Sequence, residues 1–100
     1  MTVVQVTPRA RADLKAVARW TLHNWGEDRM ASYLRTLSAR FDWLAENPSR
    51  GRIRNDVGTG YRSFPEGRHM IFYLVIPAGI AIIGVPHQAM DVESHFDGEP

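Results

Sequence analysis

The first half of the chain carries mostly apolar residues at steps of three or four, the spacing of one face of an α-helix. Thr7-Pro8 is a helix-start signal and Gly26 a helix-end signal, so a first helix is expected between them. Acidic Glu27-Asp28 opens a second helix, which Asn47-Pro48 closes. The two apolar stripes are Ala10, Leu14, Val17, Thr21 and Trp25, then Met30, Leu34, Leu37, Phe41 and Leu44. Two helices joined through one glycine predict an antiparallel hairpin.

The second half of the chain predicts strands separated by short turns. A β-branched run at residues 3–6 precedes the helices, and residues 48–60 are expected to form a polar, glycine-rich loop. Three strands follow at residues 61–64, 68–76 and 80–85, with Pro-Glu-Gly and Pro-Ala-Gly turns between them. The order β-α-α-β-β-β predicts an α+β domain in which the helix hairpin packs on one face of an antiparallel sheet.

The strand expected at residues 69–76 is apolar at nearly every position rather than at alternate ones. Such a strand has both of its faces covered in a folded protein. The helix hairpin can cover one face, and what covers the other is left open by the sequence.

Length and composition narrow the class of protein. One hundred residues, 44% of them hydrophobic, predict one domain over residues 1–96, with a frayed acidic tail at 97–100. The absence of cysteine excludes disulfides, thiolate metal sites and a cysteine nucleophile. The longest apolar stretch, residues 70–79, is too short to span a bilayer, and the N-terminus lacks the pattern of a secretion signal. We therefore expect a cytoplasmic protein that does not enter a membrane.

Common catalytic motifs are missing from the sequence. It has no phosphate-binding glycine loop, no Gly-x-Ser-x-Gly and no His-Glu-x-x-His, so no catalytic residue, cofactor or metal is expected. His87, Asp91 and His95 would share one face of a helix, which is a weak metal-site signal that Pro86 weakens further. His69, beside a core strand, is expected to be a hydrogen-bonded structural residue.

Arginine supplies eleven of the twelve cations, although the formal net charge is only +1. Arg62 and Arg68 flank a predicted turn, the loop arginines at 50, 52 and 54 lie upstream, and His87 follows the neighbouring strand. Together they could form one basic rim suited to an anionic partner. The alternative is a solvated basic surface with salt bridges to Asp56 and Glu66.

Three tryptophans are many for so short a chain. Trp25 falls on the apolar stripe of the first helix, whereas Trp20 and Trp43 fall beside the stripes of their helices. Large aromatic side chains outside the stripe indicate a protein-binding groove on the hairpin. The alternative is that they complete the edge of the core, because tryptophan is often only partly buried.

Short motifs occur in a fixed order along residues 3–95. They are Thr7-Pro8, Ala12-Asp13-Leu14, Trp25-Gly26, Ala31 with Tyr33, Leu44-Ala45-x-x-Pro48-x-x-Gly51-Arg52, Gly60-Tyr61-Arg62-Ser63, Arg68-His69-Met70-Ile71-Phe72-Tyr73 and His87-Gln88-x-Met90-Asp91. In this order the motifs make the chain resemble ParE-type toxins of the RelE/ParE superfamily of bacterial toxin–antitoxin pairs.

The resemblance implies a toxin component of a type II toxin–antitoxin system that inhibits DNA gyrase and forms a hetero-oligomer with a ParD-like antitoxin. Within that function, we expect the basic rim residues Arg62, Arg68 and His87 to face gyrase, and Trp20 and Trp43 to contact the antitoxin. RelE-like relatives instead cut mRNA on the ribosome with arginine, lysine and tyrosine or histidine side chains. This chain has one lysine and no tyrosine beside His87, which favours a gyrase poison that acts by binding, with nucleic acid contacted only through the complex.

Pro86 departs from the family pattern, which has a large aliphatic residue before the His-Gln pair. Proline removes a ladder donor, so the last strand is expected to end early or to lie at an edge. Two alternatives stay open: an mRNA endonuclease that uses His87 with the arginines, and a degenerate toxin that acts only through antitoxin binding.

Overall fold

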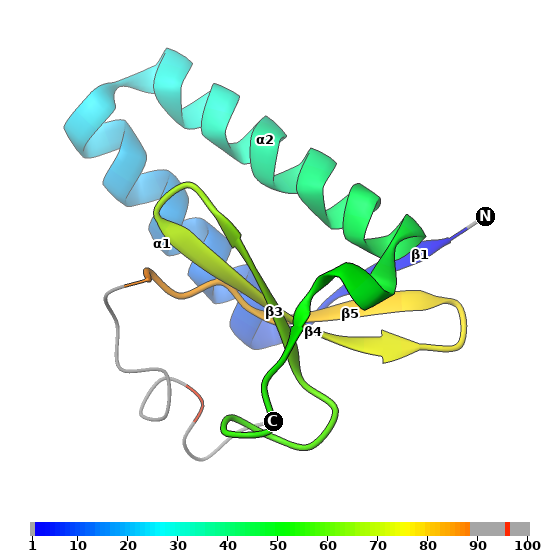
Figure 1. Ribbon diagram of the computed structural model, residues 1–100. Coiled ribbons are helices and arrows are strands. Elements are labelled where there is room, and N and C mark those ends of the chain that lie inside the picture. Colours follow the sequence, from blue (N-terminus) through cyan, green and yellow to red (C-terminus); the bar gives the residue numbers. More distant parts are fainter. Residues whose placement is uncertain (1, 89–95, 97–100) are drawn as a thin grey trace.

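The computed structural model describes residues 2–88 and residue 96. The chain folds into two layers, with a helix hairpin lying across one face of a five-stranded sheet (Figure 1). Its elements are β1 (Val3–Val6), α1 (Pro8–Trp25), α2 (Glu27–Glu46), the 3-10 helix η1 (Pro48–Arg50), β2 (Arg52–Ile53), β3 (Arg62–Glu66), β4 (His69–Ile76) and β5 (Gly79–Gly84). The α+β architecture predicted from the sequence is confirmed.

The ends of the helices follow the predicted signals. The Thr7 side chain caps α1 by accepting a 3.2 Å hydrogen bond from the backbone N–H of Ala10, and Pro8 occupies the first helical turn. Gly26 joins the two helices at a φ of 90°, in the left-handed region that favours glycine. One residue therefore reverses the chain and sets the two helices side by side.

The sheet has the order β1-β5-β4-β3-β2, and its β1 strand runs parallel to β5. The prediction of a wholly antiparallel sheet is therefore wrong at this edge. Short turns fix the antiparallel pairing of β3, β4 and β5, but β1 is separated from β5 by most of the chain, which permits a parallel pair. The opposite edge holds β2, whose two residues pair with β3 inside the segment expected to be loop.

The core lies between the helix hairpin and the sheet. Helix residues Val17, Leu37 and Leu44 pack there against Ile71 and Tyr73 of β4. The other core members include Ala10, Phe41, Ala45, Ile80, Ile82 and Val85.

The second face of β4 is also covered, as its apolar sequence predicts. Phe72 is fully buried, and successive residues of a strand point to opposite faces, so Phe72 faces away from the hairpin. The ring of Phe96 contacts the Phe72 ring at 5.0 Å, and the Arg54 guanidinium lies 5.1 Å from the same ring. The chain itself therefore supplies cover for the face of β4 that the sequence leaves open.

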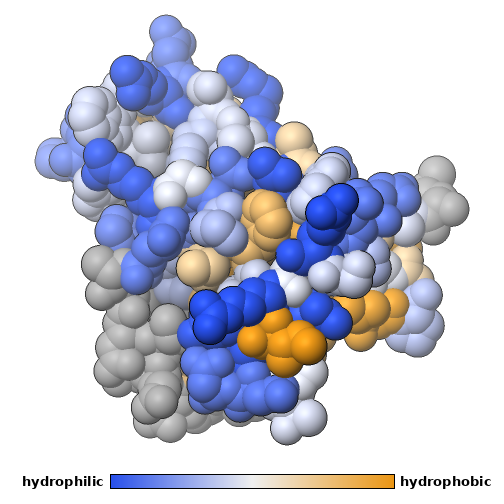
Figure 2. All heavy atoms as spheres, in the orientation of Figure 1, coloured by the Kyte–Doolittle hydropathy of each residue, from blue (hydrophilic) through white to orange (hydrophobic). Residues whose placement is uncertain are grey.

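Large apolar side chains that stay exposed are scattered over the surface. The face seen in Figure 2 is mainly hydrophilic, with strongly apolar atoms confined to small separate spots. Trp25, expected on the core stripe, is 49% exposed, so that prediction is wrong. The reason is its position as the last residue of α1, directly before the Gly26 reversal. Within the described residues, no helix is long and apolar enough to cross a membrane.

Candidate functional site

Two shallow grooves meet along Trp20 and His69. The first has a volume of about 280 Å³, and we call it the Arg68 groove. Its lining residues are Trp20, Thr21, Trp25, Arg29, Tyr33, Gly67, Arg68 and His69. The second has a volume of about 320 Å³, and we call it the His87 groove. Its lining residues are Asp13, Ala16, Val17, Trp20, His69, Val85, Pro86 and His87.

The Arg68 groove combines exposed indole rings with guanidinium groups. The Arg68 guanidinium lies 5.5 Å from the Trp20 ring and 5.8 Å from the Trp25 ring, and Arg29 lies 5.3 Å from the Trp25 ring. These distances are typical of cation–π contacts. Within residues 2–88 and residue 96, neither arginine has a carboxylate at ion-pair distance. The groove is therefore aromatic and positively charged.

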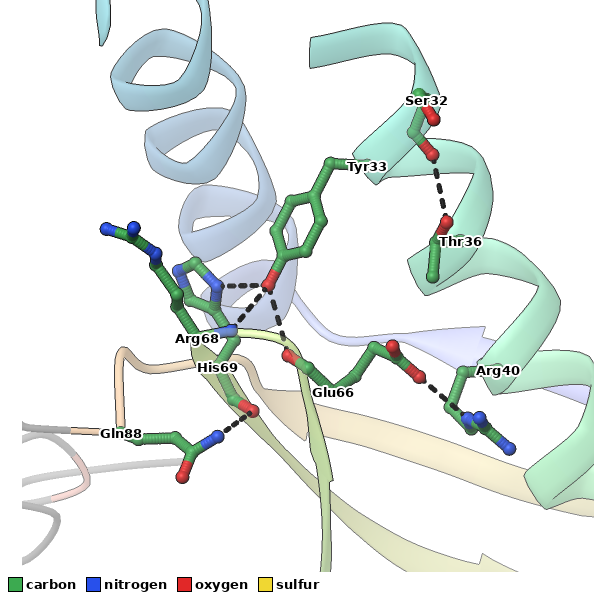
Figure 3. Close-up of polar contacts among 8 residues, drawn as sticks. All are labelled: Ser32, Tyr33, Thr36, Arg40, Glu66, Arg68, His69 and Gln88. Carbon is green, nitrogen blue, oxygen red and sulfur yellow. Dashed lines mark hydrogen bonds and ion pairs between the residues drawn. The ribbon is translucent and has the colours of Figure 1, made fainter. Parts of the chain in front are cut away.

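The Tyr33 hydroxyl, projecting from α2, holds the turn between β3 and β4 (Figure 3). It lies 3.0 Å from the carbonyl oxygen of Glu66, 3.1 Å from the backbone nitrogen of Arg68 and 2.7 Å from Nδ1 of His69. Gly67, at a φ of 55°, brings the turn close, since a Cβ there would lie 2.7 Å from the tyrosine ring and hydroxyl. The turn that carries Arg68 is thus fixed to the helix hairpin.

The donors and acceptors around the Tyr33 hydroxyl determine the tautomer of His69. The Glu66 carbonyl can only accept a hydrogen bond and the Arg68 N–H can only donate one, while the Tyr33 hydroxyl has a single proton. All three contacts are satisfied when Tyr33 donates to Glu66 and accepts from both Arg68 and His69. Neutral His69 then carries its proton on Nδ1, and its Nε2 is an acceptor.

Burial shifts the pKa values of both His69 and Tyr33 further from 7. Loss of solvent, helped by nearby His87 and Arg68 and opposed by Asp13, lowers the pKa of His69 to about 4. Burial is also the main cause that raises the pKa of Tyr33 above its ordinary value near 10. Near pH 7, His69 is a weak base and Tyr33 a weak acid, so neither is tuned for proton transfer.

His87 reaches this site through backbone pairing that continues beyond β5. The strand ends at Gly84, one residue short of the predicted end at position 85, which confirms the expected early end. The Pro86 carbonyl nevertheless accepts a 2.9 Å hydrogen bond from the Met70 N–H, and His87 forms a β-bridge with His69. The two imidazole rings lie 5.5 Å apart. Pro86 is fully buried, and backbone pairing with β4 continues past it to His87.

Arg62 lies apart from Arg68. It begins β3, whereas Arg68 follows the end of that strand, and the four steps between Arg62 and Glu66 span about 13 Å. Its Nη1 donates a 2.9 Å hydrogen bond to the Gly51 carbonyl. The prediction of one rim shared by Arg62 and Arg68 is therefore wrong, because the strand carries its two ends apart.

Of the two acids expected to pair with the basic segment, Asp56 does so and Glu66 pairs with a helix arginine instead. Arg54 contacts Asp56 at 2.9 Å, and this hydrogen-bonded pair lowers the pKa of Asp56 below its ordinary value. Glu66 pairs with Arg40 of α2 at 2.8 Å. The alternative of salt bridges at these positions thus accounts for part of the basic segment.

Trp43 belongs to the edge of the core rather than to either groove. Its half-buried ring packs against Phe64 at a centroid distance of 5.3 Å, beneath the Arg40 guanidinium at 4.8 Å. Trp20, in contrast, is 45% exposed and borders both grooves. The structure gathers Trp20, Arg68 and His87 and separates them from Arg62 and Trp43.

Four residues of the Arg68 groove were not singled out as site residues: Trp25, Arg29, Tyr33 and His69. Trp25, Tyr33 and His69 lie within the motifs that carry the family resemblance, and Arg29 does not. Within the described residues, no group of histidine and acidic side chains could hold a metal ion. Asp91 and His95 of the weak metal-site pattern lie outside the described residues.

Comparison with known proteins is consistent across three kinds of similarity. The family model of the ParE toxin of the type II toxin–antitoxin system parDE matches residues 4–92. The chain is 34% identical over 96 residues to Toxin ParE1 of Caulobacter vibrioides, covering 96% of this chain and 99% of that protein. It is 38% identical over 92 residues to Toxin ParE1 of Mycobacterium tuberculosis, covering 91% and 94%.

A solved structure described as the chromosomal ParDE TA system from P. aeruginosa has a similar fold. The TM-score is 0.72 at 18% sequence identity, with 87% of this chain and 96% of that chain covered. At this identity the likeness concerns the arrangement of helices and strands.

Proposed function

This chain belongs to the family of ParE toxins of type II toxin–antitoxin systems, and from that membership we propose that it inhibits DNA gyrase and is neutralised by a ParD-like antitoxin. The observation that carries the proposal is an aromatic, cationic groove with adjoining acid–base groups that are unsuited to proton transfer. Such a site supports a toxin that acts by binding.

Catalysis of RNA cleavage would need an acid and a base with pKa values near the working pH. His69, which contacts His87, has a pKa of about 4, and Tyr33, which contacts His69, has a pKa raised above its ordinary value. The Tyr33 hydroxyl is also engaged in three contacts. These features favour gyrase binding over the endonuclease alternative.

Arg68 and His87, with Arg62 at the far end of β3, are our proposed gyrase contacts. Our proposed antitoxin contacts are Trp20, inside the grooves, and Trp43, outside them at the edge of the core. Because Trp20 and Arg68 line the same groove, an antitoxin seated on Trp20 would also cover Arg68. Neutralisation would then follow from direct competition for one surface.

The first test is a gyrase assay with the purified protein and supercoiled plasmid, with and without ATP. The expected result is accumulation of cleaved plasmid, which disappears when the ParD-like antitoxin encoded beside the toxin is added. Arg68→Gln should lower cleavage about ten-fold, the loss of one charge-assisted contact. Arg35→Gln, at an exposed position of α2, is the matched control and should act like the parent.

Folded, antitoxin-competent protein that leaves gyrase unaffected would contradict the proposed target. Mapping mRNA ends after induction would then test the endonuclease alternative. Protein that binds antitoxin but spares both gyrase and mRNA would be a toxin that acts only through antitoxin binding.

A further inference from the structure

The chain contains two clusters in which an arginine stacks on a tryptophan of the hairpin. In the first, the Arg40 guanidinium lies 4.8 Å from the Trp43 ring and 5.0 Å from the Phe64 ring. Its Nε donates a 2.8 Å hydrogen bond to the Glu66 carboxylate. Stacking occupies the face of this guanidinium, and the carboxylate occupies its N–H edge. We call this set the Arg40 cluster.

The Arg68 groove has the arginine and the tryptophan of the Arg40 cluster, but its described lining residues supply no carboxylate. Arg68 stacks on Trp20 and Trp25, and Arg29 adds a second guanidinium over Trp25. No acidic side chain is among the described residues that line it. The two indoles are 45% and 49% exposed. As far as the structure describes it, the groove therefore offers apolar walls and guanidinium N–H groups without a carboxylate.

The backbone that presents Arg68 is held from two sides. Its N–H bonds to the Tyr33 hydroxyl, and its carbonyl accepts a 2.8 Å hydrogen bond from the N–H of Gln88. The Gln88 side chain also donates to the Gly67 carbonyl at 2.8 Å. A turn fixed in this way loses little freedom when a ligand binds.

We propose that the Arg68 groove binds a carboxylate-bearing side chain within an apolar segment of the antitoxin, and that Tyr33 is the positioning residue that presents Arg68 to it. The carboxylate would take the place that Glu66 takes beside Arg40, and the flanking apolar side chains would pack on the two indoles. The proposal rests on the proposed function for the identity of the partner.

A protein segment fits the surface better than a nucleic acid does. The adjoining His87 groove continues past Trp20 with apolar walls from Val17, Val85 and Pro86, and it includes the Asp13 carboxylate. These apolar walls suit the side chains of a peptide that crosses both grooves better than they suit a phosphate backbone.

The test uses two short peptides that differ at one atom group. The first is acetyl-Ala-Leu-Glu-Leu-Ala-amide, and the second has Gln in place of Glu. Each is titrated into isotopically labelled toxin while the indole N–H signals are followed by NMR. The glutamate peptide should shift the signals of Trp20 and Trp25 and spare that of Trp43. It should bind about five-fold more tightly than the glutamine peptide, as a charge-assisted pair predicts.

Variants separate the parts of the proposal. Arg68→Gln should reduce the preference for glutamate to less than about two-fold, whereas Arg35→Gln should preserve it. Tyr33→Phe should lower the same preference while Arg68 is still present. If Tyr33 only stabilised the fold, Tyr33→Phe would weaken the binding of both peptides equally. The ratio of the two affinities therefore distinguishes positioning of Arg68 from a structural role.

Three results would overturn the proposal. The first is equal affinity for the two peptides, and the second is a preference that survives Arg68→Gln. The third is a larger shift of the same indole signals by inorganic phosphate than by the glutamate peptide, which would indicate a nucleic acid ligand. The gyrase assay uses no peptide, so rejection of the groove and rejection of the gyrase target are separate outcomes.

Discussion

Arg40 and Arg68 each lie over a tryptophan of the helix hairpin, at 4.8 Å and 5.5 Å from the ring. Both arginines are near the same hairpin of β3 and β4, and Glu66 belongs to both neighbourhoods. Its carboxylate pairs with Arg40, and its backbone carbonyl accepts the hydrogen bond of Tyr33 beside Arg68 (Figure 3). The clusters therefore share residue types and a common piece of backbone.

The carboxylate makes the difference between the two clusters. In the Arg40 cluster it neutralises the guanidinium, and the tryptophan becomes part of the core edge. In the Arg68 groove the described residues provide no such group, and both tryptophans stay about half exposed. The same pair of residue types thus stabilises the fold in one place and presents a binding surface in the other.

Truncating the two tryptophans should separate these roles most strongly. Trp43→Ala removes a ring that packs on the core, so we expect the free energy of unfolding to fall by about 3 kcal/mol. Trp20→Ala removes a ring that is already 45% exposed and should cost about 1 kcal/mol. Urea denaturation of the two variants measures both values. Equal losses would show that Trp20 is as much a core residue as Trp43.

The second prediction concerns the free energy of unfolding of the chain at acid pH, through His69 of the Arg68 groove. The pKa of His69 is about 4 in the folded chain, against an ordinary value of about 6.5 for the unfolded chain. Between these values the unfolded chain binds a proton that the folded chain excludes, so stability falls as the pH drops from 6.5 to 4 and levels off below. The loss should reach about 2 to 3 kcal/mol, measured by denaturation across that range.

Substitution of histidines provides the control for this pH dependence. His69→Gln can still donate a hydrogen bond to Tyr33 but cannot titrate, so most of the slope between pH 6.5 and 4 should disappear. His23→Gln, at an exposed position of α1, should leave the slope unchanged. A slope that survives His69→Gln would assign the effect to other groups.

The sequence predicted most of the fold because its signals are long or local. Each helix stripe has five residues, and the Thr7 cap and the Gly26 reversal act over a few residues. The direction of β1 could not be predicted, because its partner β5 lies more than seventy residues away. The strand β2 has only two residues and shows no periodicity.

The site was less predictable because its residues come from distant parts of the chain. His87 comes close to the residue after Arg68 because the chain beyond β5 bridges back to His69 at the start of β4, which the pattern of strands indicates. Tyr33 donates a hydrogen bond to Glu66 of the turn, 33 residues later in the chain, and no spacing in the sequence predicts this contact. Arg62 and Arg68 looked adjacent across a turn, but the turn is shorter than expected and β3 separates them.

The third prediction tests whether the Tyr33 hydroxyl holds the turn beneath Arg68. Tyr33→Phe leaves the Glu66 carbonyl, the Arg68 N–H and His69 Nδ1 without this partner. The free energy of unfolding should fall by about 1 to 2 kcal/mol. Tyr61→Phe is the matched control, because the Tyr61 hydroxyl has no hydrogen bond with the described residues, and it should change stability by less than about 0.5 kcal/mol.

The smallest effect is expected from two substitutions that remove one guanidinium each, one from the Arg40 cluster and one from the Arg68 groove. They test the comparison most directly. Arg40→Gln breaks a partly buried pair with Glu66, so we expect a loss of about 1 kcal/mol, reduced in high salt. Arg68→Gln removes no ion pair with the described residues and should change stability by less than about 0.5 kcal/mol. Thermal unfolding at low and high salt measures both. A comparable, salt-sensitive loss for Arg68→Gln would mean that its charge is already balanced within the chain, and the distinction between a closed and an open cluster would fail.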